Sequence, residues 1–196
     1  MKIVILDRDG VINHDSDEFI KSVDEWQPIT GSLEAIARLN RQGYRVVVAT
    51  NQSGVARGLF SLETLNAIHH HMLEQVRQKG GEIDAIFFCP HGPDDQCDCR
   101  KPSIGMMRDI AARLKTEIRG TPSVGDSLRD LQAAQRCGAL PVLVKTGKGK
   151  RTLREMKKAD SPLEETAIAQ FSNLAEFADA LIGGELDERI RELVNA

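Results

Sequence analysis

The sequence predicts an α/β fold in which helices cover both faces of a parallel β-sheet. Short apolar, often β-branched runs recur along the chain, at 2–6, 45–50, 85–89, 122–125 and 141–147. Longer segments with apolar residues at helical spacing separate them, at 31–43, 61–81, 104–114 and 128–138. Strands that alternate with helices favour parallel pairing through right-handed crossovers.

Local signals support each element in turn. The first run, KIVIL, is continuously apolar after its initial lysine, as expected of a strand buried on both faces. Gly43 is suited to end the segment 31–43 as a C-cap. Ser61 is suited to cap the segment 61–81, and Glu63 complements the dipole of its first turn. These signals predict helices between consecutive strands.

The length of 196 residues fits one domain that buries a real core. We expect a single domain over 1–196, with a core at 1–147 and a charged, helical tail at 148–196. The tail offers little obvious chemistry. The basic stretch 145–158 could touch phosphate, but it is interpreted as a solvated face. No large cap insert is visible between the first two strands, so the site should be fairly open.

Composition limits the classes of partner that the chain is expected to bind. The formal net charge is −3 and aromatic residues make up 4%, which favours neither nucleic acid nor acidic membranes. No apolar run approaches the roughly 18 residues that span a bilayer. The first residues lack the features of a signal peptide. We therefore expect a cytoplasmic monomer that binds a small molecule, with no membrane or nucleic-acid partner.

Polar clusters follow four of the predicted strands. Ligands of parallel sheets bind at the carboxyl ends of the strands, so these clusters should share one edge. In chain order they are DRDG, TNQSG, RKP and GDSLRD. Their convergence is stronger evidence for a site than any one of them.

The first cluster places Asp7 and Asp9 on either side of Arg8. Two Asp beside a Gly are also common in simple turns. In the functional interpretation, alternation along an extended chain points both carboxylates toward one site. Asp7 would then be a nucleophile, and Asp9 a general acid and base. Carboxylates this close repel, so both are candidate ligands of a cation, and oxygen ligands suit Mg²⁺.

The second and third clusters could stabilise a phosphoryl group. Thr50 and the Gly-containing loop after it offer hydroxyl and backbone N–H donors, although capping and turn formation would also explain them. Lys101 could neutralise an attacking carboxylate and a phosphoryl group together. Arg100 offers a planar fork for a second phosphate or for hydroxyls. A solvated basic pair is the commoner fate of such a dipeptide.

The fourth cluster contributes Asp126 and Asp130. Asp126 follows a strand and could complete the Mg²⁺ ligands. Asp130 lies one helical turn later on the same face and could bind Lys101. Either Asp could instead complement the dipole of the helix N-terminus. The four clusters together describe phosphoryl transfer to Asp7, with Asp9 protonating the leaving oxygen and then activating water.

The chain resembles the haloacid-dehalogenase-like phosphatases. LDRDGVIN, VATNQSG, RKP and VGDSLRD occur in that family's order and at its strand ends, over about residues 2–147. The resemblance implies a Rossmann-like sheet, catalytic Mg²⁺ and an aspartyl-phosphate. It also implies roles for five residues: Asp7 as nucleophile, Asp9 as acid and base, Thr50 and Lys101 as phosphoryl stabilisers, and Asp126 as a metal ligand.

A second set of residues predicts a structural Zn²⁺. Cys89, His91, Cys97 and Cys99 supply three thiolates and an imidazole, a closed tetrahedral set. A redox centre, a disulfide and a catalytic thiol are the alternatives, but the chain has no CxxC redox motif. The loop between these residues has few apolar side chains, so Zn²⁺ would order it and thereby place Arg100 and Lys101.

The segment CPHGPDDQCDCRKP is similar to zinc-bearing members of the family, the heptose-bisphosphate 7-phosphatases and the histidinol-phosphatases. SGVARG favours the heptose enzymes, while the short loop between His91 and Cys97 keeps histidinol phosphate as the alternative substrate. The heptose resemblance implies hydrolysis of the C7 phosphate of D-glycero-D-manno-heptose 1,7-bisphosphate. Such a reaction serves the synthesis of ADP-heptose or GDP-heptose for lipopolysaccharide or S-layer precursors.

The same resemblance implies substrate contacts along three segments and at one further arginine. They are Asp15, Ser16, Asp17, Glu18, Asn51, Gln52, Ser53, Arg57 and Arg100. The acidic Ser16–Glu18 stretch departs from the family pattern. A zinc-stabilised binding module is the interpretation from a different class, but it would need a basic face or exposed aromatic residues.

Three consecutive histidines and one cysteine are left without a catalytic role. His69, His70 and His71 point about 100° apart on a helix and cannot all face one metal. We expect surface and partly buried positions for them. Cys137 lies in an apolar helix, away from the other cysteines in the sequence, and is expected to be a small core residue.

Overall fold

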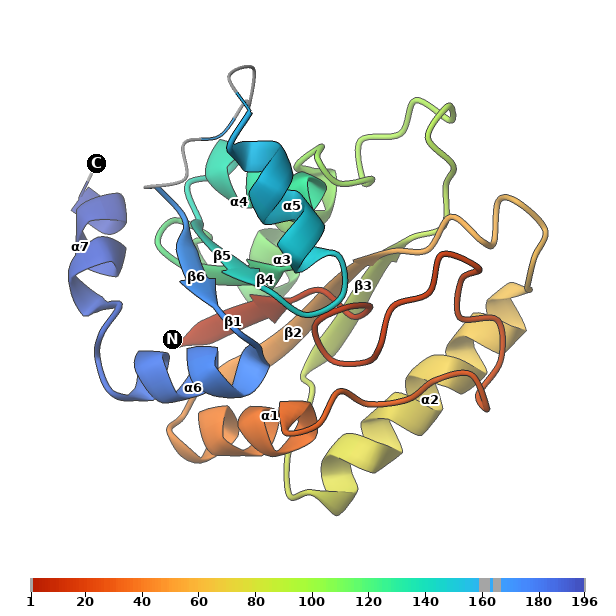
Figure 1. Cartoon of the computed structure of the whole chain (residues 1–196), viewed down its shortest axis with the longest axis horizontal. Helices are drawn as coiled ribbons and strands as arrows, with labels where there is room; N and C mark the ends of the chain where they lie inside the picture. Colours follow the sequence, from red (N-terminus) through yellow and green to blue (C-terminus); the bar gives the residue numbers. More distant parts are fainter. Residues whose placement is uncertain (1, 159–162, 164–166, 196) are drawn as a thin grey trace.

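The computed structural model describes residues 2–158, 163 and 167–195 (Figure 1). The strands are β1 (Ile3–Leu6), β2 (Arg45–Asn51), β3 (Ala85–Cys89), β4 (Pro122–Gly125), β5 (Leu140–Val144) and β6 (Ala169–Phe171). The helices are α1 (Ser32–Arg41), α2 (Leu62–Gln78), α3 (Gly105–Leu114), α4 (Leu128–Arg136), α5 (Gly149–Met156), α6 (Leu174–Ile182) and α7 (Asp187–Asn195).

The six strands form one parallel sheet in the order β3-β2-β1-β4-β5-β6. The predicted fold class is thereby confirmed. β1 lies between β2 and β4, so the chain leaves β1 toward one half of the sheet and later returns to build the other half. Leu6, at the end of β1, pairs with Val48 on one side and with Val124 on the other. This switch point brings the segments after β1, β2 and β4 to one edge.

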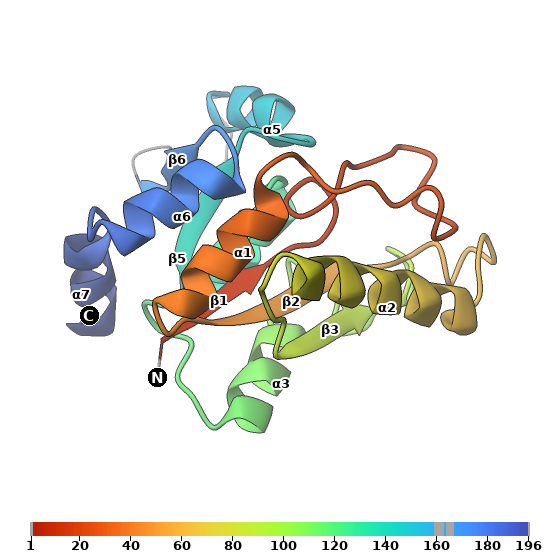
Figure 2. The ribbon, with the colours of Figure 1, turned by 90° about the horizontal axis from the view of Figure 1, so that it is seen from below.

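Helices cover both faces of the sheet (Figure 2). α1, α2 and α6 lie on one face, where Ile36, Ile68 and Phe177 belong to one buried apolar cluster with β-strand side chains. On the opposite face, α3 and α4 bury Met107 and Ala134 against β1 and β2. Strands buried from both sides read as uninterrupted apolar runs, which is why KIVIL and RVVVA were diagnostic.

The C-terminal part is not helical throughout, contrary to the expectation for 148–196. β6 pairs in parallel with β5 and extends the sheet by a sixth strand. α6 then buries Leu174, Phe177 and Leu181 in the same cluster as α1. Of the predicted tail, residues 159–162, 164–166 and 196 lie outside the described part of the chain. The described remainder completes both the sheet and the core.

The connections that overhang the sheet edge are loops. Within 2–158, 163 and 167–195, no folded cap follows β1 or β2. A long loop instead leads from β1 to α1, and isolated bridges from Asn13 to Asp9 and to Pro28 fasten it. None of the helices in the described ranges is long and apolar enough to cross a membrane.

Candidate active site

A cavity of about 250 Å³ opens at the carboxyl ends of the strands. Every residue predicted for catalysis or substrate binding lines it except Glu18: Asp7, Asp9, Asp15, Ser16, Asp17, Thr50, Asn51, Gln52, Ser53, Arg57, Arg100 and Lys101, together with the predicted metal ligand Asp126. Residues more than 90 positions apart in the sequence therefore meet in one place, as the strand-end argument requires. Glu18 sits in an exposed turn and faces solvent.

Asp7 follows β1 directly, and its backbone N–H donates to the Val124 carbonyl at 2.9 Å. This bond fixes the residue between β1 and β4. Burial raises the pKa of the Asp7 carboxyl to about 6, although the nearby Lys101 ammonium opposes the shift. A desolvated carboxylate is less shielded by water and is therefore a better nucleophile than a hydrated one.

Lys101 is only 2% exposed, and its ammonium spans two carboxylates. Nζ lies 3.2 Å from Asp7 Oδ1 and 2.6 Å from Asp130 Oδ1, and it donates to the Ala49 carbonyl at 2.7 Å. Burial alone would lower the pKa of Lys101, but the charges of Asp130 and Asp7 outweigh burial and raise it. Lys101 is therefore a fixed positive charge beside the predicted nucleophile.

The Asn51 side chain holds the Lys101 backbone on both sides. Asn51 Nδ2 donates to the Lys101 carbonyl at 3.0 Å, and the Lys101 N–H donates to Asn51 Oδ1 at 3.1 Å. Asn51 was predicted as a substrate contact. It lines the cavity, and it also joins the end of β2 to the segment that carries the lysine.

Asp130 combines the two roles that the sequence left open. Its Oδ2 accepts hydrogen bonds from the Ser127 N–H at 3.0 Å and the Ser127 hydroxyl at 2.6 Å, which satisfies the N-terminus of α4. Its Oδ1 meanwhile pairs with Lys101. Both oxygens are thus engaged, and the lysine charge lowers the pKa of Asp130 even though burial alone would raise it.

Three carboxylates converge in a way that fits a divalent cation. Ligand oxygens of Asp7, Asp126 and Asp130 all lie within 4.8 Å of one another. Burial, followed by repulsion from Asp130 and Asp7, raises the pKa of Asp126 to about 8, so the ionised form needs a compensating positive charge. Gly10 has a φ of +80°, and a Cβ there would strike Asp126 Oδ2. An oxygen-only set of this kind suits Mg²⁺.

Asp9 is not one of these three carboxylates, and its role as a Mg²⁺ ligand stays a prediction. Its side chain turns toward Arg8, whose Nε and Nη2 donate to the two carboxylate oxygens at 3.0 and 2.9 Å. Asn13 Nδ2 and Gln52 Nε2 also donate to it, each at 2.9 Å. Although burial would raise the pKa of Asp9, the Arg8 charge and these hydrogen bonds lower it.

The loop after β2 links Asp9 to the phosphoryl-binding residues. Gln52 Nε2 donates to Thr50 Oγ1 at 2.9 Å in addition to its bond with Asp9. Thr50, Gln52 and Ser53 are all buried, so their polar groups face the cavity edge rather than bulk water. Both Thr50 and Ser53 thereby offer hydroxyls where a phosphoryl oxygen could bind.

Three arginines, together called the arginine wall, line the same cavity. Arg57, Arg100 and Arg129 line the cavity, and Arg129 was not predicted. Burial lowers the pKa of Arg100, and the positive charges of Arg129 and Arg57 add to this effect. The Arg57 guanidinium also lies over the Phe19 ring, 5.8 Å from its centroid. The wall is a ready counter-charge for a second anionic group of a ligand.

Lys148 is a site residue that sequence reasoning missed. Its Nζ lies 2.7 Å from Asp15 Oδ2, and its backbone N–H donates to Asp126 Oδ2 at 2.7 Å. Thr146 Oγ1 donates to the Gly10 carbonyl at 2.6 Å and fastens the same turn. The available signal was its position just after the strand predicted at 141–147, at the same sheet edge as the other clusters. Lys148 was not singled out, because the whole basic stretch 145–158 was interpreted as a solvated face.

The four predicted zinc ligands converge beyond the end of β3. The Cys89 sulfur lies 3.1 Å from the Cys99 sulfur and 3.6 Å from the Cys97 sulfur, and His91 Nδ1 lies 3.3 Å from the Cys99 sulfur. Thiolates about 2.3 Å from a tetrahedral ion would lie about 3.7 Å apart, so the set fits Zn²⁺ with small adjustments. The four cysteines of the chain are free thiols.

Comparisons with known proteins agree with this geometry. The HAD-hydrolase-like family model matches residues 98–170. A D-glycero-beta-D-manno-heptose-1,7-bisphosphate 7-phosphatase of Bordetella bronchiseptica is 61% identical over 155 residues, which cover 79% of this chain and 87% of that protein. The corresponding enzyme of Pseudomonas putida is 53% identical over 182 residues, with 93% of this chain and all of that protein covered.

A solved structure extends the likeness to three dimensions. The crystal structure of D,D-heptose 1,7-bisphosphate phosphatase from B. bronchiseptica, complexed with magnesium and phosphate, superposes with a TM-score of 0.87. It is 56% identical in sequence, and the match covers 93% of this chain and 99% of that one.

Proposed function

The chain belongs to the family of D-glycero-β-D-manno-heptose-1,7-bisphosphate 7-phosphatases, and from this premise we propose that it removes the C7 phosphate of that sugar bisphosphate through an aspartyl-phosphate at Asp7. The observation that carries the proposal is the pairing of the partly buried Asp7 carboxylate with the buried Lys101 ammonium in a cavity that also has an arginine wall.

The first half-reaction transfers the phosphoryl group to the enzyme. An Asp7 carboxylate oxygen attacks phosphorus, the bond between phosphorus and the C7 oxygen breaks, and Asp9 gives its proton to that oxygen. Lys101 and the Thr50 hydroxyl stabilise the charge on the phosphoryl oxygens. Asp9 is held ionised in the free protein, but a phosphate dianion beside it is a like charge and raises its pKa toward the acid form.

The second half-reaction returns the phosphoryl group to water. Asp9, now ionised, takes a proton from a water molecule whose oxygen attacks phosphorus, and the bond to Asp7 breaks with its electron pair returning to the carboxylate. Inorganic phosphate leaves, and Asp7 is regenerated. The hydrogen bonds that lower the pKa of Asp9 favour this base role.

Two metal ions belong to the proposal. Asp7, Asp9 and Asp126 would hold Mg²⁺ rather than Asp130, because both oxygens of Asp130 already serve Lys101 and Ser127. Bound Mg²⁺ would supply positive charge to the site and offset the repulsion among its carboxylates. Cys89, His91, Cys97 and Cys99 would hold structural Zn²⁺, whose binding energy orders the loop ahead of Arg100.

The shape of the site suits a small substrate with two charged ends. Asp7 and Lys101 lie at the floor of the cavity, where the C7 phosphate reacts. Arg57 and Arg100 lie on the wall, where they are proposed to take the second phosphate. Sugar hydroxyls between the two ends would meet the polar segment Asp15–Asp17. We propose that the enzyme is a monomer, since one chain supplies the whole cavity. We also propose that it acts in the cytoplasm, as expected from the sequence.

A substrate panel tests the proposal. Phosphate release with Mg²⁺ is measured for both anomers of the heptose 1,7-bisphosphate, for fructose 1,6-bisphosphate and for histidinol phosphate. At least one heptose anomer should be hydrolysed with a kcat/KM about 100-fold above the other compounds, because histidinol phosphate lacks a second phosphate and fructose 1,6-bisphosphate carries its two phosphates on a shorter carbon chain. Comparable rates on all four would contradict the assignment. Asp7→Asn should abolish turnover with the fold intact, whereas a binding module would be unaffected.

A further inference from the structure

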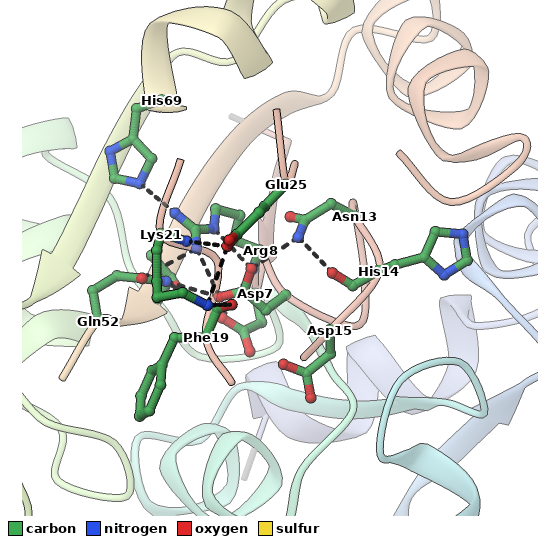
Figure 3. Close-up of polar contacts among 12 residues, drawn as sticks. Asp7, Arg8, Asn13, His14, Asp15, Phe19, Lys21, Glu25, Gln52 and His69 are labelled. Carbon is green, nitrogen blue, oxygen red and sulfur yellow. Dashed lines mark hydrogen bonds and ion pairs between the residues drawn. The ribbon is translucent and has the colours of Figure 1, made fainter. Parts of the chain in front are cut away.

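The side chain of Arg8 is fully buried, although it lies in a turn between two catalytic aspartates. Its guanidinium meets three partners, of which Gln52 and His69 are labelled in Figure 3. Nε and Nη2 donate to the two oxygens of Asp9. Nη2 also donates to Gln52 Oε1 at 3.1 Å, and Nη1 lies 3.2 Å from Nε2 of His69. The guanidinium is therefore held on the side that faces Asp9 and on the side that faces helix α2.

His69 must act as a hydrogen-bond acceptor in this contact. A guanidinium has only donors, so Nε2 of His69 carries the lone pair and the ring proton sits on Nδ1. The imidazole is 6% exposed, and its ring packs edge-on against Phe88 with centroids 5.8 Å apart. Burial, and then the Arg8 charge, lowers the pKa of His69 to about 3, which agrees with a neutral ring.

Replacing His69 with a residue that cannot accept a hydrogen bond would also disturb Asp9, through Arg8. The Nη1 group of Arg8 would become a buried donor without its partner, which is costly, and the planar guanidinium would turn to find another. Because the same plane carries Nε and Nη2, such a turn breaks the two-point contact with the Asp9 carboxylate. The orientation of Asp9 thus depends on a residue that does not touch the substrate cavity.

We propose that His69 is a positioning residue for acid–base catalysis: it fixes the Arg8 guanidinium, which in turn aims the Asp9 carboxylate at the scissile oxygen and the attacking water. The inference rests on the proposed function. It gives a role to one member of the HHH run that the sequence left without one. The two neighbouring histidines differ, since His70 is exposed and pairs with Glu74, and His71 packs edge-on against Trp26.

The experiment compares His69→Leu, which removes the acceptor, with His69→Gln, whose side-chain carbonyl can accept from Arg8. His70→Leu is the matched control on the same helix. With the heptose bisphosphate as substrate, His69→Leu should lower kcat about ten-fold or more and leave KM within about two-fold, because positioning acts on the transition state. His69→Gln should stay within about three-fold of the unchanged protein, and His70→Leu should match it.

A second readout separates positioning from a general structural defect. p-Nitrophenyl phosphate has a leaving group that needs no proton, so transfer to Asp7 should stay fast while hydrolysis of the aspartyl-phosphate, which needs Asp9 as base, slows. Stopped-flow traces of His69→Leu should show an unchanged burst rate constant followed by a slower steady state. If His69→Leu does not fold, Arg8→Lys, which keeps the charge and loses the fork, takes its place with the same expectation.

Three results would overturn the inference: a kcat for His69→Leu equal to that of His70→Leu, an effect confined to KM, or equal loss of burst and steady-state rates. Failure of the proposed function would look different. The unchanged protein would then leave the heptose bisphosphate intact, while the aryl phosphate would still report on His69.

Discussion

At the scale of single residues, the chemistry is proposed to rest on the partly buried Asp7 and the buried Lys101, which carry opposite charges. Removing each charge from water costs free energy. The ion pairs of Lys101 with Asp7 and with Asp130 offset part of that cost. Chemical type alone predicted Asp7 and Lys101 from the sequence, since a carboxylate and a lysine at strand ends are natural for phosphoryl transfer. Arg8 and His69 were not predicted as site residues. Their roles depend on the direction of the Arg8 side chain, which contacts both Asp9 and His69, and the sequence does not give that direction.

His69 should make stability depend on pH. Its pKa is about 3 in the folded protein and about 6.5 when unfolded, so the unfolded chain binds a proton between these values while the folded protein does not. The stabilising effect is complete above about pH 6.5 and is lost as pH falls toward 3. Between pH 7.5 and pH 5, the free energy of unfolding should drop by about 2 kcal/mol from this group.

Urea titrations at the two pH values check this dependence. His69→Gln removes the titrating ring, so its drop should be smaller by about the same 2 kcal/mol. His70→Gln, which replaces an exposed neighbour, should keep the drop of the unchanged protein. An identical pH dependence in His69→Gln and the unchanged protein would show that the ring is not held neutral.

The first structural element that bears on the proposed function is the loop between β3 and α3, which carries the proposed Zn²⁺ ligands. Arg100 Nη1 donates to the His91 carbonyl at 3.2 Å, so a hydrogen bond links the proposed Zn²⁺ ligand His91 to the arginine wall. Cys99→Ala should therefore lose stoichiometric zinc and lower kcat/KM about ten-fold or more. Metal analysis alongside steady-state kinetics checks both, with Cys137→Ala as the control that keeps its zinc. Full activity in a zinc-free Cys99→Ala would refute the link.

The turn between β5 and α5 is a second such element. Lys148 joins Asp15, on the long loop after β1, to the sheet edge. Replacement by Met should free that loop and raise KM about five-fold, as expected from the loss of a half-buried ion pair worth about 1 kcal/mol. The exposed Lys150, two residues on, is the matched control, and its replacement by Met should leave KM unchanged. Equal KM values in both variants would remove Lys148 from the site.

Elements with strong periodicity were predicted close to their observed bounds, and elements set by tertiary context were not. The segment 61–81 predicted α2, which spans Leu62–Gln78 between Ser61 and a Gly pair. β6 has only three residues and could not be told from a loop by its pattern. Its pairing with β5 depends on a strand edge that exists only in the folded sheet.

At the scale of the whole molecule, the C-terminal segment is part of the core rather than an appendage. Phe177 on α6 is fully buried and meets Phe171 of β6 edge-on, with centroids 5.7 Å apart. Phe177→Ala should therefore lower the free energy of unfolding by about 3–5 kcal/mol. The control is Ile182→Ala, at the end of the same helix, where the side chain is 36% exposed. It should lower the free energy of unfolding by less than about 1 kcal/mol.

Urea-induced unfolding measures both changes. A loss at Phe177 no larger than that at Ile182 would support an independent domain that ends near residue 147. The sequence predicted the parallel sheet, because strands that alternate with helices generally pair in parallel through right-handed crossovers. It also predicted the edge at which the polar clusters meet, because ligands of such sheets bind at the carboxyl ends of the strands. It did not predict which half of the sheet the last residues complete, since that depends on packing between α1 and α6.

The most direct test of the account is a crystal grown with Mg²⁺ and beryllofluoride, a mimic of a phosphoryl group bound to a carboxylate. The account predicts beryllium bonded to an Asp7 oxygen, with fluorines in contact with Lys101 Nζ and the Thr50 hydroxyl. Asp7→Asn should bind none under the same conditions. Beryllofluoride bonded to another carboxylate, with Asp7 free, would contradict the claim that Asp7 is the nucleophile.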